Sequence, residues 1–154
     1  QPRPAGQPRL PLDAIQNPII DAYLAALPPG TAPRILASRT AFVTESTRHA
    51  RALAQPGLQA QAAHHRALGH VLPGDTLDDY IAAFDVHLGT PEAVCASLLQ
   101  DSSLQRVTDI SFQVHSIDPP HAEILRSIDL LAADVGPSLG WSPSSLTSAK
   151  EITA

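Results

Sequence analysis

The sequence predicts an α/β fold in which parallel strands alternate with helices. Residues 34–43 and 107–115 have the two-residue alternation of side chains that is typical of strands. Segments with helical spacing of apolar residues precede, separate and follow them, and strands that alternate with helices form parallel βα units. The chain has 154 residues, of which 44% are hydrophobic and 16% charged. These values are typical of one globular domain or of a piece of a larger one.

The first half of the chain predicts a helix, a strand and a second helix. Asp13 is a suitable N-cap for a helix that runs to Leu27 and is ended by two prolines and a glycine. The strand 34–43 has a mixed face, which we expect to lie inside and which consists of Leu36, Ser38, Thr40 and Phe42. The alanine-rich residues 44–68 predict a helix that is interrupted at Pro56-Gly57.

The second half is less regular at its start. Residues 69–88 predict a short helix at 77–84 within an otherwise irregular insertion. Thr90 and Pro91 are a strong helix start, as N-cap and first helical residue. The apolar stripe expected on that helix consists of Val94, Leu98 and Leu99. A last helix at 121–136 should cover the strand before it with Ile124, Ile128, Leu131 and Val135.

The strand 107–115 has two faces of opposite chemistry. Ile110, Phe112 and Val114 point one way, and the other face carries Asp109, Ser111, Gln113 and His115. If the following helix covers the apolar face, the polar face must look either into water or into the upper interior of a (β/α)8 barrel. In such barrels the active site lies at the carboxyl ends of the strands. The alternation alone leaves both environments open.

Composition and spacing argue against several classes of function. The net charge is −5 and the ten basic residues are scattered, so no nucleic-acid partner is expected. No apolar stretch reaches the ~20 residues of a membrane helix. His64, His65 and His70 lack the spacing and the additional Cys or carboxylate ligands of a zinc site, so no metal site is expected. Cys95 cannot form an internal disulfide because it is the single cysteine, which favours a cytoplasmic location.

Three segments resemble, in order and spacing, the closing part of the bacterial luciferase-like monooxygenases. They are Pro33-Arg-Ile-Leu-Ala-Ser-Arg-Thr-Ala-Phe-Val43, Gly89-Thr-Pro-Glu-Ala-Val94 and Leu125-Arg-Ser-Ile-Asp-Leu-Leu-Ala-Ala-Asp-Val-Gly-Pro137. The resemblance implies that residues 1–141 are the C-terminal part of a (β/α)8 (TIM) barrel, with about two βα units and a helical insertion. Residues 142–154, rich in serine and threonine, are expected to form a flexible tail.

The resemblance also implies a function and a cofactor. Enzymes of this family use reduced flavin, usually FMN and in some branches a deazaflavin, and oxygen to oxidise a small organic substrate. Most flavin contacts in the family come from strands that would precede this chain. We therefore expect FMN to be bound mainly by residues that the chain does not contain, and the chain alone to be inactive.

Six residues are candidates for the site. His115, at the end of the last strand, is the candidate catalytic residue, although a histidine bonded to a loop carbonyl would fit the same position. Gln113 and Ser111 lie deeper on the same face and are candidates for substrate contacts or for packing. The insertion would supply lid residues that exclude water from the flavin, namely Tyr80, Phe84 and His87.

A non-catalytic function is the alternative. Two strands do not make a stable sheet with both faces covered, so the chain could be a partial barrel that pairs with the remaining part of the barrel, with a copy of itself, or with another chain. The proline-rich residues 1–11 read as a loop. Such a start is expected either of a loose terminus or of a chain cut from a longer protein.

Overall fold

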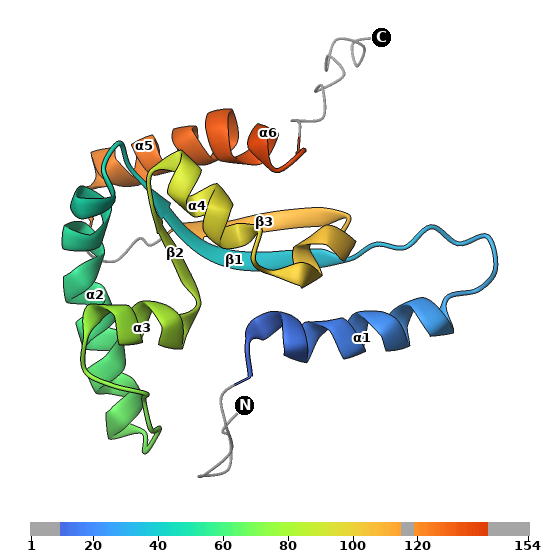
Figure 1. Cartoon of the computed structure of the whole chain (residues 1–154), viewed down its shortest axis with the longest axis horizontal. Helices are drawn as coiled ribbons and strands as arrows, with labels where there is room; N and C mark the ends of the chain where they lie inside the picture. The colour runs from blue at the N-terminus through green and yellow to red at the C-terminus, as the bar shows by residue number, and fades with distance from the viewer. Residues whose placement is uncertain (1–9, 115–118, 142–154) are drawn as a thin grey trace, which may run out of the picture.

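The computed structural model describes residues 10–114 and 119–141. It contains a sheet of three parallel strands with the order β2-β1-β3, surrounded by helices (Figure 1). This architecture confirms the α/β class and the parallel strands. The elements in chain order are α1 (Leu12–Ala26), β1 (Leu36–Val43), α2 (Thr47–Ala67), α3 (Leu77–Phe84), β2 (Val86–Gly89), α4 (Pro91–Leu98), a 3-10 helix (Ser102–Arg106), β3 (Asp109–Val114), α5 (His121–Leu130), a π-helical segment (Leu131–Val135) and α6 (Gly136–Ser138).

The two strands that the alternation predicted are neighbours in the sheet. Residues 36–41 of β1 lie in parallel register with residues 109–114 of β3, so Ser38 is opposite Ser111 and Thr40 is opposite Gln113. The prediction of adjacent, parallel strands is therefore confirmed. The strand β2 was not predicted, because its residues lie at the end of the segment expected to be an irregular insertion. β2 has four residues and pairs with residues 40–43 on the other edge of β1.

Helices cover one face of β1 and β3. On that face Ala37, Arg39 and Ala41 of β1 are at most 3% exposed. A core cluster there joins β1 to α4, to α5 with the π-helical segment, and to Phe112 and Val114 of β3. The predicted packing of the apolar face of β3 on the last helix is thus confirmed for Phe112 and Val114, whereas Ile110 lines a pocket with Leu139 and Trp141. Figure 1 shows α5 along one side of the sheet and a long extended connection between α1 and β1.

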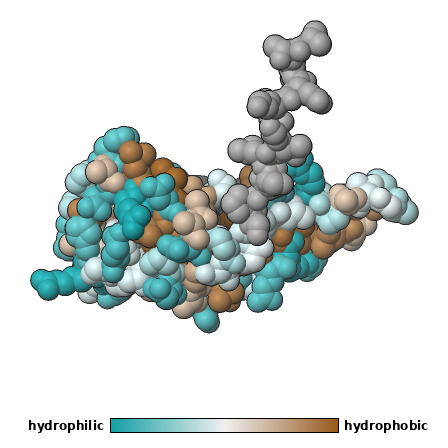
Figure 2. All heavy atoms as spheres, turned by 90° about the horizontal axis from the view of Figure 1, so that it is seen from above, coloured by the Kyte–Doolittle hydropathy of each residue, from teal (hydrophilic) through white to brown (hydrophobic). Residues whose placement is uncertain are grey.

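A second core cluster lies around β2. Ala54, Leu58 and Ala62 of α2 pack there with Tyr80 of α3 and Val86 of β2. Viewed from the side of α5, the surface shows apolar patches separated by hydrophilic areas rather than one large apolar face (Figure 2). The core is therefore divided between the two sides of β2, with α4 and α5 on one and α2 and α3 on the other.

Two helix predictions in the first half need correction. The N-cap of α1 is Pro11 rather than Asp13, which lies in the first turn and accepts a hydrogen bond of 2.6 Å from the Ser102 hydroxyl. The helix α2 runs without interruption through Pro56. A proline removes one backbone hydrogen bond, but Leu58, two residues after it, is fully buried. The packing of this side of α2 offsets the lost bond.

The buried stripes of two later helices also differ from expectation. Leu99 is the C-cap of α4 and is 57% exposed, and Ile128 of α5 is 45% exposed. On α5 the position facing the sheet is instead taken by Ser127, which is fully buried. Its hydroxyl accepts a hydrogen bond of 2.8 Å from the Val43 backbone N–H. Satisfying this buried donor outweighs the gain from burying an isoleucine there.

Candidate functional site

The polar face of β1 and β3 is the part of the sheet that the described helices leave uncovered. We call it the open face and define it by Leu36, Ser38, Thr40, Asp109, Ser111 and Gln113. Ser38, Ser111 and Gln113 are exposed, and Leu36 is 65% exposed. Paired residues on parallel strands lie about 5 Å apart. The open face therefore presents three hydroxyl groups and one amide at close spacing.

The six predicted site residues do not all come together. Ser111 and Gln113 share the open face, as the alternation predicted. His115 lies outside the described residues, so its position stays a prediction. Tyr80 and Phe84 belong to α3 and pack against α2 and β2, while His87 lies on the opposite, helix-covered face of the sheet.

The packing of Tyr80 and Phe84 is specific. Tyr80 is 6% exposed, its hydroxyl accepts a hydrogen bond of 3.3 Å from Arg66, and that guanidinium lies 5.5 Å from the ring centroid. The ring of Phe84 lies 5.0 Å from that of His65 on α2. Both aromatic side chains hold α3 on α2. The structure therefore gives them a packing role, and it does not bring them to Ser111 and Gln113.

The carboxyl edge of the sheet gathers two helix starts next to the open face. The β1 chain continues through Thr44, whose N–H donates to the Gly89 carbonyl at 2.9 Å. Ser46 caps α2 and Thr90 caps α4. Helix N-termini carry partial positive charge, and ligands of parallel α/β sheets bind at this edge.

Gly89 is required by the closeness of these two helix starts. Its φ is +145°, and a Cβ at this position would lie 2.9 Å from the Thr47 hydroxyl oxygen and 3.1 Å from the Ala93 Cβ. Residues with a side chain rarely adopt this conformation. Gly89 thus allows the end of β2 to lie close to the first turn of α2 at the carboxyl edge.

Two polar side-chain contacts link α5 to α2 and to the residue shortly before it, beside this edge. The Arg126 Nε donates to Glu45 Oε1 at 2.7 Å, and His49 Nε2 lies 3.3 Å from Glu123 Oε1. The hydrogen bond from Arg126 holds the pKa of Glu45 below its ordinary value. These side chains are largely exposed. They orient the start of α2 relative to α5 more than they stabilise the fold.

The sequence analysis missed a buried polar network around Arg39. This side chain is fully buried on the helix-covered face and binds Asp101 through Nε at 2.7 Å and Nη2 at 2.6 Å. The same Nη2 donates to Gln16 of α1 and to Ser103, at 2.7 and 2.9 Å. A charged residue between the apolar positions Ala37 and Ala41 was the available signal. Its partners lie far away in the sequence and could not be read from it.

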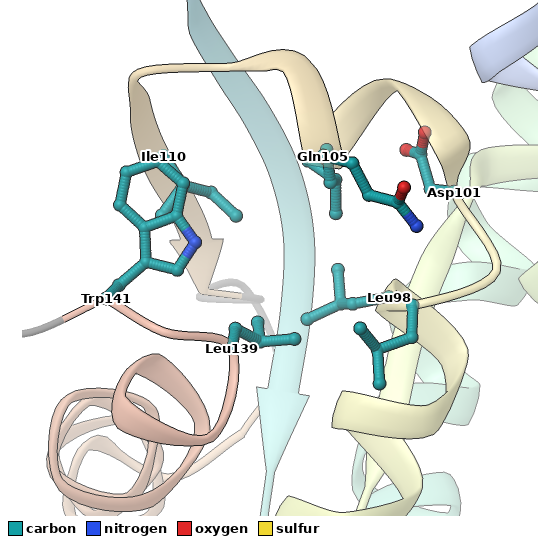
Figure 3. Close-up of a pocket in the computed structure, with 8 residues that line it drawn as sticks. Leu98, Asp101, Gln105, Ile110, Leu139 and Trp141 are labelled. Carbon is teal, nitrogen blue, oxygen red and sulfur yellow. The ribbon is translucent and has the colours of Figure 1, made fainter.

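A small pocket lies at the opposite end of the sheet. It has a volume of about 80 Å³ and an apolar lining, with Asp101 and Gln105 at one end and Trp141 and Leu139 at the other (Figure 3). Ile110, near the start of β3, marks its position at the amino ends of the strands. In βα proteins this end contributes to stability, whereas ligands bind at the carboxyl end. We therefore do not place the site in this pocket.

Neither comparison with known proteins nor a search of the described residues for metal and membrane sites identifies a function. A comparison with models of known protein families finds no match, and a comparison with curated proteins finds no relative. Within residues 10–114 and 119–141 no group of three His, Cys, Asp or Glu side chains could hold a metal ion. In the same part of the chain no helix is long and apolar enough to cross a membrane.

Proposed function

We propose that the chain is the C-terminal part of a flavin-dependent monooxygenase of the luciferase-like type, in which β1 and β3 are neighbouring strands of a (β/α)8 barrel. The observation that carries the proposal is the two-sided sheet. One face of β1 and β3 is covered by helices, and on the other face Ser38, Ser111 and Gln113 are exposed, whereas Phe42 at the carboxyl end of β1 is fully buried. Barrel strands have the same arrangement, with helices outside and the reacting groups inside, towards the carboxyl ends.

The strand order sets a condition on this proposal. In a barrel of consecutive βα units each strand lies beside the next one in the chain, whereas here β3 lies beside β1 and β2 lies on the other edge. The proposal therefore requires β2 to be an additional short strand outside the barrel sequence. β2 pairs with residues 40–43 of β1 and leaves residues 36–39 of that edge without a strand among the described residues. A preceding barrel strand would have to pair there.

The described residues fit one part of a flavin better than another. Ser38, Thr40, Ser111 and Gln113 offer donors and acceptors of the kind that the polar edge of an isoalloxazine ring needs. A phosphate needs cationic side chains or several free backbone N–H groups, and Arg39 points to the other side of the sheet. FMN, or a deazaflavin, would thus be held mainly by other parts of the protein.

The open face would supply binding and orientation. Reduced flavin, when bound, supplies the oxygen chemistry that oxidises a small organic substrate. Gln113 and Ser111 would orient the cofactor or the substrate by hydrogen bonds, and His115 is the proposed catalytic residue. We further propose a cytoplasmic location. The half-buried Cys95 thiol, whose pKa is raised by burial, is compatible with a reducing compartment.

Flavin binding tests this proposal. Reduced FMN and a reduced deazaflavin are titrated anaerobically into the full protein that carries this segment and into the 154-residue chain. We expect binding by the full protein, and at least a tenfold weaker affinity for the Gln113→Leu variant, which corresponds to about 1.4 kcal/mol. Gln59→Leu, on the exposed side of α2, is the matched control and should bind as tightly as the wild type. Equal affinities of the two variants would contradict the site, and no flavin binding would contradict the function.

A non-catalytic partner-binding function is the second candidate. The outer edge of β3 has no partner strand among the described residues. Ile19, Tyr23 and Leu24 of α1 are between 37% and 65% exposed. Unpaired strand edges and apolar helix surfaces favour association with another chain. A stable oligomer in light scattering, without any flavin binding, would favour this candidate.

A further inference from the structure

His87 is a buried histidine with one satisfied and one unsatisfied ring nitrogen. It is 6% exposed and lies on the helix-covered face of β2, next to Ala41 of β1. Its Nδ1 lies 2.8 Å from the Ser97 hydroxyl oxygen of α4. Its Nε2 is buried and has no hydrogen-bond partner among the described residues. Unpaired buried polar atoms are rare and call for an explanation.

The neutral ring tolerates this surrounding better than the charged ring does. If Nδ1 donates its proton to Ser97, only a lone pair is left unpaired at Nε2. An unpaired acceptor is less costly than an unpaired N–H. The imidazolium ion carries an N–H on both nitrogens, so in either tautomer protonation leaves a buried, charged N–H at Nε2 without an acceptor. A buried charge without a hydrogen-bond partner is more costly than a neutral polar group in the same place.

Charged neighbours act on His87 in both directions. Burial is the largest influence and lowers the pKa of His87. Asp85, before β2, and Asp101, before the 3-10 helix, favour the charged ring, whereas Arg39 on β1 opposes it. The hydrogen-bonding group from α4 is the uncharged Ser97. Since Asp101 is itself paired with Arg39, their opposing effects on His87 largely cancel, and burial decides.

The position of His87 connects its protonation to the carboxyl edge. β2 is held to the sheet by only four residues, and its last residue, Gly89, accepts the hydrogen bond from Thr44. The chain continues directly through Thr90 into α4. Loss of the His87 packing would therefore loosen β2 and the start of α4 together.

We propose that His87 is an acid-sensitive latch, which in its neutral form holds β2 and α4 on the sheet and on protonation releases them. The inference is independent of the proposed flavin chemistry, because it rests on the packing of described residues alone. It predicts a definite sign. In the unfolded chain a histidine titrates near 6.5, and the folded protein takes up this proton only at lower pH. The free energy of unfolding is therefore highest above about pH 6.5 and falls as the pH decreases from that value.

The pH dependence of stability from His87 is limited because this side chain takes up only one proton. Between the unfolded and the folded pKa of His87, the unfolding equilibrium constant should rise up to tenfold for each unit by which the pH falls. Below the folded pKa the contribution stops growing. Carboxylates, which titrate mainly below about pH 5, add little within the window from about pH 5.5 to 7.5.

The test combines urea unfolding with NMR on the full chain. The wild type should lose stability from pH 7.5 to 5.5, whereas His87→Asn, whose amide can still reach Ser97 but does not titrate, should lose much less. His64→Gln, at an exposed position of α2, is the control and should keep the wild-type slope. The ¹⁵N shifts of His87 in the wild type should show a neutral ring with the proton on Nδ1 at pH 6, where a histidine of an unfolded chain is partly charged.

Two results would overturn the latch. One is a His87→Asn variant with the wild-type dependence on pH. The other is a His87 ring that titrates at or above about pH 6.5, the value of a histidine in an unfolded chain. The NMR titration uses the wild-type chain, so it decides the question even if His87→Asn does not fold.

Discussion

The two faces of the sheet are built by the same strands and have opposite composition. On β1, Ala37, Arg39 and Ala41 are buried by helices. On its other face Leu36 and Ser38 are exposed, and burial there is complete only at Phe42, at the carboxyl end of the strand. On β3 the apolar Phe112 packs into the core and the neighbouring Gln113 is exposed. The comparison shows that the covered face carries the stability and leaves the open face free to be polar. Substitutions on the two faces should therefore have separable effects.

The largest expected effect is on the covered face, at Arg39. The Arg39→Ala substitution leaves the Asp101 carboxylate, which is only 11% exposed, without its cation. Removing one partner of a buried ion pair typically costs about 3–5 kcal/mol, and urea unfolding would measure the loss. The double variant Arg39→Met, Asp101→Asn should recover part of it, because no unpaired charge remains. Equal losses in the single and the double variant would show that the charges themselves do not matter.

The second prediction compares adjacent residues of β3 on opposite faces. Phe112→Ala should lower the free energy of unfolding by about 2 kcal/mol, because it removes a large, partly buried side chain that packs against the core cluster. Gln113→Ala, one residue further and exposed, should change it by less than about 0.5 kcal/mol. Thermal or urea unfolding of both variants tests the pair. If both cost the same, the open face is covered in the native protein.

A smaller effect is expected at Ser127, where the covered face meets the carboxyl edge. Ser127→Ala leaves the buried Val43 N–H without an acceptor, which should cost about 1–3 kcal/mol. Asp129→Ala, at an exposed position of the same helix, is the control and should be close to neutral. Hydrogen exchange of the Val43 amide should also become faster in the Ser127 variant alone. Unchanged exchange would mean that the hydroxyl does not protect this amide.

The smallest effect is expected from the exposed pair of Glu45 and Arg126. Glu45→Gln removes the carboxylate whose pKa is held low by the hydrogen bond from Arg126, but exposed ion pairs are screened by water and salt. We expect no change in the unfolding midpoint at high salt and a barely measurable one at low salt. A large effect that is independent of salt would show that the pair is part of the buried framework.

Local patterns in the sequence predicted those elements whose signals are local. The two-residue alternation located β1 and β3 and separated Phe112 from Gln113 correctly. The Thr90-Pro91 start of α4 was predicted because N-capping depends on a few adjacent residues. Helix ends and interruptions were less certain. The expected break at Pro56 is absent, since packing further along α2 outweighs the one lost hydrogen bond.

Features that depend on distant partners were not predictable. β2 has too few residues for an alternation to be recognised, and it forms because residues 40–43 offer an unpaired edge. Ile128 was predicted to face the sheet, but Ser127 takes that position because the buried Val43 N–H needs an acceptor. Of the candidate site, Ser111 and Gln113 were grouped from their positions on one strand. Tyr80, Phe84 and His87 are separated from them by the fold.

The sequence by itself therefore determined the α/β class, the parallel β1–β3 pair and the polar character of one strand face, because these depend on the spacing of neighbouring residues. Only the tertiary structure decided the strand order β2-β1-β3, the burial of Arg39 with Asp101 and the position of His87 behind the sheet. These features join residues up to 87 positions apart, as in the hydrogen bond between Ser103 and Gln16. Such contacts depend on how complete helices and strands pack against one another. The spacing of neighbouring residues carries no information about this packing.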